Sequence, residues 1–443
     1  MNEVEFIDGF SCREKWLELR FIHLKTSHNF LVSVVVVALV GLALVGLTWI
    51  NYRYSVQNPG GSDFLPRWVG TRQFLMKAQS PYSDATTQEI QQRFYGRPAR
   101  SNEDQVLFVY PFYSIFIFGP FALINDYNMA RAVWMTVLEC SIILIAAASI
   151  SLSLWKPSPF MLLVLLIFSA LWYYGIRALI NANASILIGL LVVGAFLAIR
   201  AGQDSWAGLL LALATIKPQV VILLVLFVLL WSISEGRWLL FWSFLGNLAL
   251  MIAITSLLIP DWIWQNLRQV MSYPGYTLPG TPGAIFIQWL PGVGKQLGWA
   301  LTIFLTTTLL WEWRLARKQG FNWFLWTAYL TLVITTMIGI RTATENYVLL
   351  FPALVLVFSA WDQEWGVFGR GLIGFSYALL FFGIWWLFLA TLERGDQPVQ
   401  SSIMFFPLPA FLLVGLYWIR WWVLRPERPL LDQWRNPRRR LEG

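Results

Sequence analysis

Asp63 is the residue of this sequence best placed to do acid–base chemistry. It follows the turn-forming sequence Asn58-Pro59-Gly60-Gly61-Ser62 and directly precedes an amphipathic stretch, in a polar segment between two apolar runs. The only two histidines, His23 and His28, lie before the first apolar run, on its expected cytoplasmic side. An acid or base on the opposite side must therefore be a carboxylate or a tyrosine. Alternatively, Ser62 or Asp63 caps a helix that begins near Pro66, and one carboxylate can do both.

The same polar segment carries an excess of basic residues. Short translocated loops usually avoid such an excess, so it asks for an explanation. An anionic substrate would provide one, and a phosphate near the lipid surface is the natural candidate; solvated surface charge is the alternative. The basic residues are Arg53, Arg67, Arg72, Lys77, Arg93, Arg97 and Arg100.

Lys217 is the second candidate, because it lies inside the apolar run from Trp206 to Trp231. A lysine in such a run costs roughly 2.5 to 3.5 kcal/mol on insertion scales, so a function is the default expectation. Its partner can be Glu139, in a structural ion pair, or a phosphate. Polar residues at the ends of other apolar runs are expected to line the same cavity. They are Arg177, Asn181, Asn183, Arg341 and Glu345.

The sequence offers no ligand set for a metal ion or a cofactor. It has no Cys/His cluster, and the polar segment has no Asp-x-Asp motif, so neither is expected. Cys12 and Cys140 fall before the first apolar run and inside a later one, which leaves no disulfide for the outer side. The net charge of +8 comes from basic clusters that set membrane topology, so the lipid bilayer is an expected partner and nucleic acid is not.

Helices that cross a membrane must position these residues. Hydrophobic residues make up 57% of the 443 and charged residues 13%, and runs approaching the ~20 residues of a membrane helix recur. Backbone groups in lipid must pair within their own segment, so these runs have to be helices. We predict an all-α polytopic membrane protein with about twelve spans and both termini on the cytoplasmic side. The spans are Phe30–Ile50, Phe112–Ile124, Ala130–Leu154, Phe160–Ile176, Ser185–Ala198, Trp206–Trp231, Leu239–Ile259, Leu297–Trp313, Trp323–Ile340, Val348–Trp361, Leu372–Leu392 and Ile403–Val423.

The chain is expected to form one membrane domain over residues 1–443. Its first span is predicted to be an uncleaved signal anchor, so that the polar segment after it is translocated. The run that contains Lys217-Pro218 is either one bent span or a pair of half-helices, because proline removes a helix hydrogen bond. The orientation of residues 177–233 stays open. The remaining regions are a cytoplasmic segment (1–29), a first outer loop (51–110), a second outer loop (260–294) and a basic cytoplasmic tail (424–443).

The first outer loop is predicted to carry two interfacial helices. Apolar residues recur at helical spacing along its first half, with Arg67 facing elsewhere. A second helix is expected from Thr86 to Phe94, ended by Gly96 and Pro98. The second outer loop is rich in Pro, Gly and aromatic residues and is expected to form an irregular wall. The apolar stripe of the first helix consists of Leu65, Trp68, Val69, Leu75 and Met76.

The order of these features resembles glycosyltransferase family 87, the polyprenol-phosphate-mannose-dependent mannosyltransferases of the GT-C fold. The resemblance covers most of the chain through several short motifs. Three positions depart from the family pattern: Tyr110-Pro111-Phe112 replaces Tyr-Pro-Pro, Asn181-Ala182-Asn183 replaces a Gly-Gln-x-Asn-like run, and Glu345-Asn346 stands where relatives can carry His. The matching motifs are Asp63 after the first span, Ser80-Pro81-Tyr82, Tyr110-Pro111, Ile216-Lys217-Pro218, and Tyr347 before Phe351-Pro352.

The resemblance implies an inverting transfer of a hexose, mannose in the family, from a polyprenyl-phosphate donor to a lipid-linked or glycan acceptor. It implies Asp63 as the general base, Lys217 and Arg341 on the phosphate side, and an active site on the extracytoplasmic side of the plasma membrane. The alternatives are a transporter or flippase of lipid or lipid-linked sugar, and a catalytically silent relative that binds glycolipid. The expected substrate-binding residues are Arg67, Tyr82, Tyr110, Arg177, Asn181, Asn183, Lys217, Gln219, Arg341, Glu345 and Tyr347.

Overall fold

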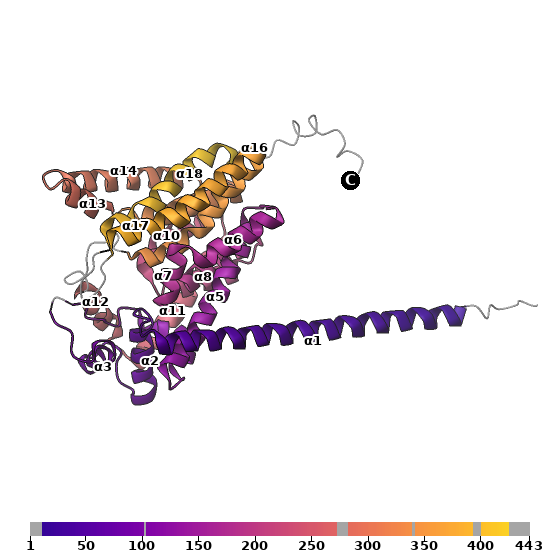
Figure 1. The fold of residues 1–443 in the computed structure, drawn as a ribbon, viewed down its shortest axis with the longest axis horizontal. Coiled ribbons are helices and arrows are strands. Elements are labelled where there is room, and N and C mark those ends of the chain that lie inside the picture. The colour runs from indigo at the N-terminus through magenta and orange to yellow at the C-terminus, as the bar shows by residue number, and fades with distance from the viewer. Residues whose placement is uncertain (1–10, 102, 273–281, 339–341, 393–399, 425–443) are drawn as a thin grey trace, which may run out of the picture.

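The described part of this computed structural model consists of helices and connecting loops and contains no β-strand (Figure 1). Because the apolar runs satisfy their backbone hydrogen bonds within helices, the prediction of an all-α protein is confirmed. The structure describes residues 11–101, 103–272, 282–338, 342–392 and 400–424.

The apolar helices identify a multi-pass membrane protein. In the described residues, five helices are long and apolar enough to cross a membrane, and a pair bent by 44° would make a sixth. Shorter apolar helices of 10–17 residues accompany them. The count of about twelve spans stays a prediction. The five long segments are Val32–Gln57, Tyr127–Leu152, Trp238–Leu258, Thr344–Thr391 and Ser402–Val423, and the bent pair is α6 (Pro159–Leu171) with α7 (Tyr173–Ile180).

Helix α1 (Ser11–Gln57) extends away from the other helices, and only its C-terminal end packs against α5 (Tyr127–Leu152) (Figure 1). Polar side chains make this contact: Asn51 Nδ2 donates to Glu139 Oε2 at 2.8 Å, and the hydroxyls of Thr48 and Thr136 lie 3.0 Å apart. The contact fixes the point at which the chain leaves α1 and enters the loop that carries Asp63.

The segment expected to form the first outer loop contains two helices: α2 (Leu65–Lys77) and α3 (Asp84–Tyr95). Ser83 caps α3, and Gly96, with φ +71°, ends it. The stripe of α2 is buried only in its first half, where the helix packs against α4 (Ile115–Ala122) and Trp68 Nε1 donates to the Phe121 carbonyl. Leu75 and Met76 are exposed, and Arg67, expected to face elsewhere, is buried.

The Lys217-Pro218 sequence separates two helices, α9 (Asp204–Ala214) and α10 (Pro218–Ser234). Lys217 adopts a non-helical backbone conformation with φ −128° and ψ 73°. Proline has no backbone N–H to lose at the first position of a helix, so it begins α10 without cost. Of the two possibilities, the pair of separate helices is therefore correct. Lys217 lies at the break, not within a continuous helix.

The second outer region is more ordered than its composition suggests. Helix α12 (Trp262–Ser272) lies within it, so the expected irregular wall was wrong for these residues. Its polar side chains face the first loop, where Asn266 Nδ2 donates to the Tyr110 carbonyl at 3.0 Å and Gln269 Nε2 to the Tyr82 carbonyl at 3.1 Å. The remaining helices are α8 (Ser185–Arg200), α11 (Trp238–Leu258), α13 (Pro282–Trp289), α14 (Gly294–Leu315), α15 (Phe321–Thr335), α16 (Phe351–Ala378), α17 (Ile384–Thr391) and α18 (Pro407–Val423), with short 3₁₀ turns at Phe112–Ser114, Thr344–Leu350 and Ser402–Phe405.

Candidate active site

Asp63 lies between α1 and α2 and is fixed by the turn that follows α7. Its backbone N–H donates to the Asn181 carbonyl at 3.2 Å, and its Oδ2 accepts from Asn183 Nδ2 at 2.9 Å. The N-terminal cap of α2 is Phe64, and no side chain bonds to the free N–H groups there. The proposal that Ser62 or Asp63 caps this helix was therefore wrong. The carboxylate instead faces polar groups from a distant part of the sequence.

One face of α5 holds in place both the turn before Asp63 and the turn that follows α7. Arg131, 1% exposed, donates from Nη1 to the Asn58 carbonyl at 2.7 Å and from Nη2 to the Ile180 carbonyl at 3.0 Å. Tyr127 and Trp134 lie one turn away on either side; the Tyr127 hydroxyl donates to the Gly60 carbonyl and Trp134 Nε1 to the Ala182 carbonyl. These residues are spaced at i, i+4 and i+7, so they share a helix face.

This arrangement requires a glycine at position 61, two residues before Asp63. Gly61 has φ +76°, and a Cβ at this position would lie 2.6 Å from the Tyr127 hydroxyl and 2.9 Å from Arg131 Nε. A side chain would therefore meet both strain and collision. The turn-forming sequence is thus needed to bring the chain against α5 and Asp63 toward Asn183.

The turn from Asn181 to Asn183 holds a second carboxylate. Asn181 Nδ2 donates to Glu345 Oε1 at 3.0 Å, and Arg177 Nη2 lies 3.1 Å from the same oxygen. Ala182 has φ +53°, an uncommon conformation for a residue with a Cβ, and such strain is often stored at functional sites. Arg177, Asn181, Asn183 and Glu345 therefore do meet in one place, as the sequence led us to expect.

Lys217 is 4% exposed, and its ammonium has three oxygen partners. It donates to Asn183 Oδ1 at 2.8 Å, to Ser185 Oγ at 3.0 Å and to Asn346 Oδ1 at 2.6 Å. An ammonium group has three hydrogens, so these partners use all of them. No carboxylate of the described residues pairs with Lys217; Glu139 bonds to Asn51 instead. The structural Lys217–Glu139 ion pair is thus absent.

Two cations approach the ring of Tyr110. Arg67 stacks on it with Cζ 4.0 Å from the ring centroid, and Lys217 Nζ lies 6.0 Å from the same point. Arg67 is 6% exposed, and its Nε has no hydrogen-bond partner among the described residues. Leaving a buried N–H without an acceptor is costly, so Arg67 Nε is a donor that an added acceptor could satisfy.

Tyr82 lies beside Tyr110 and supports its backbone. The Tyr82 hydroxyl donates to the Tyr110 carbonyl at 2.6 Å. Burial raises the pKa of Tyr82 well above its ordinary value, and the nearby Tyr113 acts in the same direction. Tyr82 therefore stays protonated at neutral pH. As a candidate base it is poor, which leaves the carboxylates.

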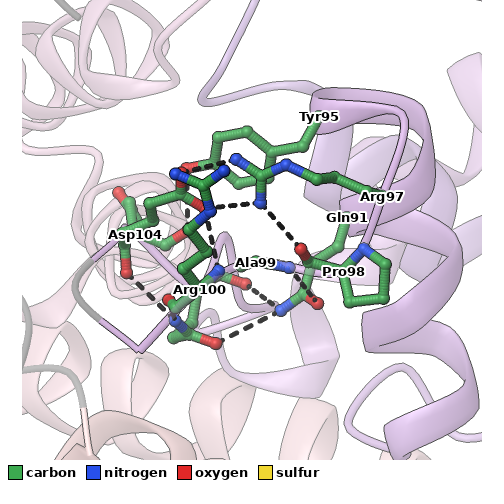
Figure 2. A network of polar contacts seen from close by, with 9 residues as sticks. Gln91, Tyr95, Arg97, Pro98, Ala99, Arg100 and Asp104 are labelled. Atoms are coloured by element: carbon green, nitrogen blue, oxygen red, sulfur yellow. Dashed lines mark hydrogen bonds and ion pairs between the residues drawn. The ribbon is translucent and has the colours of Figure 1, made fainter. Parts of the chain in front are cut away.

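The second half of the first loop is held by a network of hydrogen bonds and an ion pair that includes Asp104 (Figure 2). Arg97 pairs with Glu103 at 2.6 Å, Gln91 bonds to Ala99 and Gln105, and the Tyr95 hydroxyl donates to the Asp104 carbonyl at 2.9 Å.

Desolvation raises the pKa of the Asp104 carboxyl. The charge of Asp63 adds to this increase, whereas the Val106 N–H and the charge of Arg67 oppose it. Asp104 is thus electrostatically coupled to the candidate base.

The other expected site residues lie farther out or outside the described chain. Gln219 lines a small pocket together with Asn346 and Thr342. Tyr347 is fully buried, and its hydroxyl donates to the Phe405 carbonyl at 2.9 Å. Arg341 lies outside the described residues.

Two residues of the site, Ser185 and Arg131, were not singled out from the sequence, and Asn346 was noted only as a departure from the family pattern. Ser185 and Asn346 complete the shell of Lys217, but a serine and an asparagine beside helix ends carry no local signal of that contact. Arg131 did carry a signal, because an arginine within an apolar helix is as unusual as Lys217 and calls for the same explanation.

The fold and the site together define an all-α membrane protein whose buried cations and carboxylates converge where the first loop meets the helical bundle. Comparison with protein families gives a match to the model described as glycosyltransferase family 87 over residues 108–338. The chain belongs to this family, and it is a membrane glycosyltransferase. Comparisons with curated proteins and with solved structures gave no match. The matched region contains Asn183 and Lys217 but begins after Asp63.

Proposed function

We propose that this glycosyltransferase moves a hexose, mannose by its resemblance, from a polyprenyl-phosphate donor to a lipid-linked or glycan acceptor. The reaction takes place on the extracytoplasmic side of the plasma membrane and inverts the configuration at the sugar. Asp63 is the general base. The donor phosphate lies on the side of the site that holds Arg67 and Lys217.

The hydrogen bonding of Asp63 is the observation that carries this proposal. Asn183 engages Oδ2, whereas Oδ1 accepts no hydrogen bond from the described residues. Asp63 keeps part of its surface accessible. A carboxylate with one oxygen held and the other open is arranged to take a proton from a hydroxyl placed beside it.

The buried guanidinium of Arg67 supports a phosphate as the leaving group. Its planar fork matches a phosphate, and stacking on Tyr110 restricts its orientation before the substrate arrives. Lys217 contributes a second positive charge. Its hydrogens have other partners, so its attraction for the phosphate acts through space unless one partner is displaced.

The proposed step forms one bond and breaks one. The acceptor oxygen attacks the anomeric carbon opposite the phosphate, and its proton passes to Asp63. The bond between the anomeric carbon and the phosphate oxygen breaks, and the electron pair leaves with the polyprenyl phosphate. A positioned base is worth roughly 10² to 10⁴ in rate, and fixed cations stabilise the charge that develops on the leaving oxygen.

The experiment compares Asp63→Asn with Asp84→Asn in the full-length protein in nanodiscs. The donor is polyprenyl phosphate [³H]mannose, and membranes from cells without the protein provide acceptors. We expect Asp63→Asn to lose at least about 100-fold in transfer while retaining affinity for polyprenyl phosphate. Asp84 is exposed in the first turn of α3, so Asp84→Asn should transfer normally. Undiminished transfer by Asp63→Asn would remove Asp63 from the mechanism, and no transfer by the wild type would reject this donor.

A further inference from the structure

The ammonium of Lys217 and the carboxylate of Asp63 are linked by a single side chain, that of Asn183. Asn183 Oδ1 accepts from Lys217 Nζ at 2.8 Å and from the Ser185 backbone N–H at 2.9 Å, and Asn183 Nδ2 donates to Asp63 Oδ2 at 2.9 Å. The other partners of Lys217 are a hydroxyl and an amide oxygen. Asp63 is therefore the carboxylate to which this buried cation is connected by hydrogen bonds.

The chemistry of the neighbours fixes the orientation of the Asn183 amide. With the amide reversed, its NH₂ group would face an ammonium and a backbone N–H, and its oxygen would face a carboxylate. Each of these contacts would lose a hydrogen bond and gain repulsion. The amide dipole is thus aligned between a cation and an anion, and its hydrogen bonds to Lys217 and to Asp63 are both charge-assisted.

The backbone around Asn183 is held as firmly as its side chain. The Asn183 N–H donates to the Ala178 carbonyl at 2.8 Å, and Trp134 fixes the preceding carbonyl from α5. Asn183 is 1% exposed. A side chain that is 1% exposed, with both acceptor directions and one of its two N–H donors in use, has little capacity left for a substrate.

We propose that Asn183 is a positioning residue for Asp63: it connects the carboxylate to the ammonium of Lys217, holds Oδ2, and turns Oδ1 toward the acceptor hydroxyl. This rests on the proposed role of Asp63 as the base. It replaces a substrate-binding role for Asn183 with one exerted through Asp63. A substrate contact would mainly affect KM, whereas a positioning contact affects kcat and the pH at which Asp63 becomes protonated.

The test measures the protonation of Asp63 directly, without relying on transfer. A carbodiimide with glycine ethyl ester modifies only protonated carboxyl groups, and peptide mass spectrometry reports the modification of Asp63 as a function of pH. The protein is the full-length chain in nanodiscs. Asn183→Asp preserves the size of the side chain and an acceptor for Lys217, but turns an oxygen toward Asp63. Asn183→Ala and Lys217→Met remove the connection by other means.

We expect half-modification of Asp63 to move to higher pH by about one unit or more in all three variants. Asn183→Ala removes a hydrogen bond to the carboxylate, Lys217→Met removes a positive charge, and Asn183→Asp adds a negative one. Asn181→Ala is the matched control. It removes the neighbouring amide, which bonds to Glu345, so it should alter the modification of Glu345 and leave that of Asp63 as in the wild type. The other charged groups around this site are Arg131, Asp104, Arg67 and the Arg177–Glu345 pair, and all three variants retain them.

The proposed connection through Asn183 would be overturned if the pH of half-modification of Asp63 were unchanged in Asn183→Asp protein that gel filtration shows to be properly folded. An equal shift in Asn181→Ala would overturn it too. A second measurement uses [³H]mannose transfer, for which we expect Asn183→Asp to lower kcat at least about tenfold with little change in the KM for donor. If the pH shift occurs but Asp63→Asn still transfers sugar, the connection through Asn183 stands and the assignment of Asp63 as base fails.

Discussion

Asn181 and Asn183, two residues apart in one turn, hold two different carboxylates. Asn181 Nδ2 lies 3.0 Å from Glu345 Oε1, and Asn183 Nδ2 lies 2.9 Å from Asp63 Oδ2. The left-handed conformation of Ala182 allows the two amides to diverge over so short a distance. Glu345 is also paired directly with Arg177, whereas Asp63 is connected to a cation only through an amide. The two carboxylates therefore occupy different electrostatic environments.

This difference predicts unequal effects of neutralising them. Glu345→Gln keeps an oxygen for Asn181 and Arg177 and loses only charge, so we expect transfer to fall by less than about tenfold, the effect of one weakened ion pair. Asp63→Asn removes a base and should cost at least about 100-fold. Initial rates of [³H]mannose transfer decide between them. The base would have to be reassigned to Glu345 if its variant were the more severely impaired.

Arg67 should show a trade-off between stability and binding. Arg67 is 6% exposed and its Nε has no hydrogen-bond partner among the described residues, so replacing it by methionine removes a desolvation penalty. We therefore expect Arg67→Met to unfold at the same or a higher temperature than the wild type. Its affinity for polyprenyl phosphate should fall at least about tenfold, because a charge-assisted phosphate contact is worth roughly 1.5 to 3 kcal/mol. Thermal unfolding and lipid-phosphate binding in nanodiscs measure the two effects.

Arg72 provides the control for Arg67, because it lies on the same helix but has its own partners. It donates to the Ala122 carbonyl and to Asn125 Oδ1, both at 2.8 Å. Arg72→Met should therefore bind polyprenyl phosphate as the wild type does. A destabilised Arg67→Met protein with normal lipid affinity would assign Arg67 a purely structural role.

Lys217→Met is expected to behave in the opposite way to Arg67→Met in stability. It leaves Asn183, Ser185 and Asn346 without the donor that joins them, and unsatisfied buried polar groups cost about 1 to 3 kcal/mol. We expect Lys217→Met to have a lower unfolding temperature than the wild type. We also expect its affinity for the donor to fall more than its affinity for the acceptor. Thermal unfolding and separate binding measurements check this. A variant as stable as the wild type would contradict a stabilising role for the three hydrogen bonds of Lys217.

The sequence was most informative where a residue type conflicted with its surroundings. Lys217 in an apolar run and Asp63 after a glycine-rich turn were both selected for this reason, and the structure connects them through Asn183. Apolar residues at helical spacing also predicted α2, and Gly96 with Pro98 predicted the end of α3. The contacts of these residues could not be found in this way. Asn183 was expected in the cavity, but its position between Asp63 and Lys217, and the role of Ser185 and Asn346 as further partners of the lysine, depend on contacts between distant segments.

Two local expectations failed for related reasons. The second outer loop was judged from its prolines and glycines, yet residues Trp262–Ser272 form a helix whose polar side chains bond to the backbone of the first loop. Arg67 was expected to lie off the buried apolar stripe of α2, but α2 packs against α4 and the guanidinium is buried against the ring of Tyr110. In both cases tertiary contacts decided what local composition could not.

The Arg97–Glu103 pair predicts an acid-sensitive first loop. Hydrogen bonds from the Arg97 side chain and the Arg100 backbone N–H lower the pKa of Glu103 from 4.5 to about 2 (Figure 2). A carboxyl group whose pKa is lowered by folding stabilises the fold above its unfolded pKa. The loop should therefore keep its full stability above about pH 4.5 and lose the contribution of Glu103 as the pH falls toward 2.

Hydrogen exchange of the Arg100 amide provides the measurement, because that N–H bonds to Glu103 Oε2 at 2.8 Å. We expect protection, corrected for intrinsic exchange, to decrease across this pH interval in the wild type. In Glu103→Gln the protection should be lower at neutral pH and should change little on acidification, because the titrating group is gone. Glu89→Gln breaks the more exposed Arg93–Glu89 pair and should retain the wild-type profile at Arg100. Equal acid sensitivity in Glu103→Gln would show that another carboxyl group controls the loop, and Asp104, whose pKa is shifted upward, would not fit a transition below pH 4.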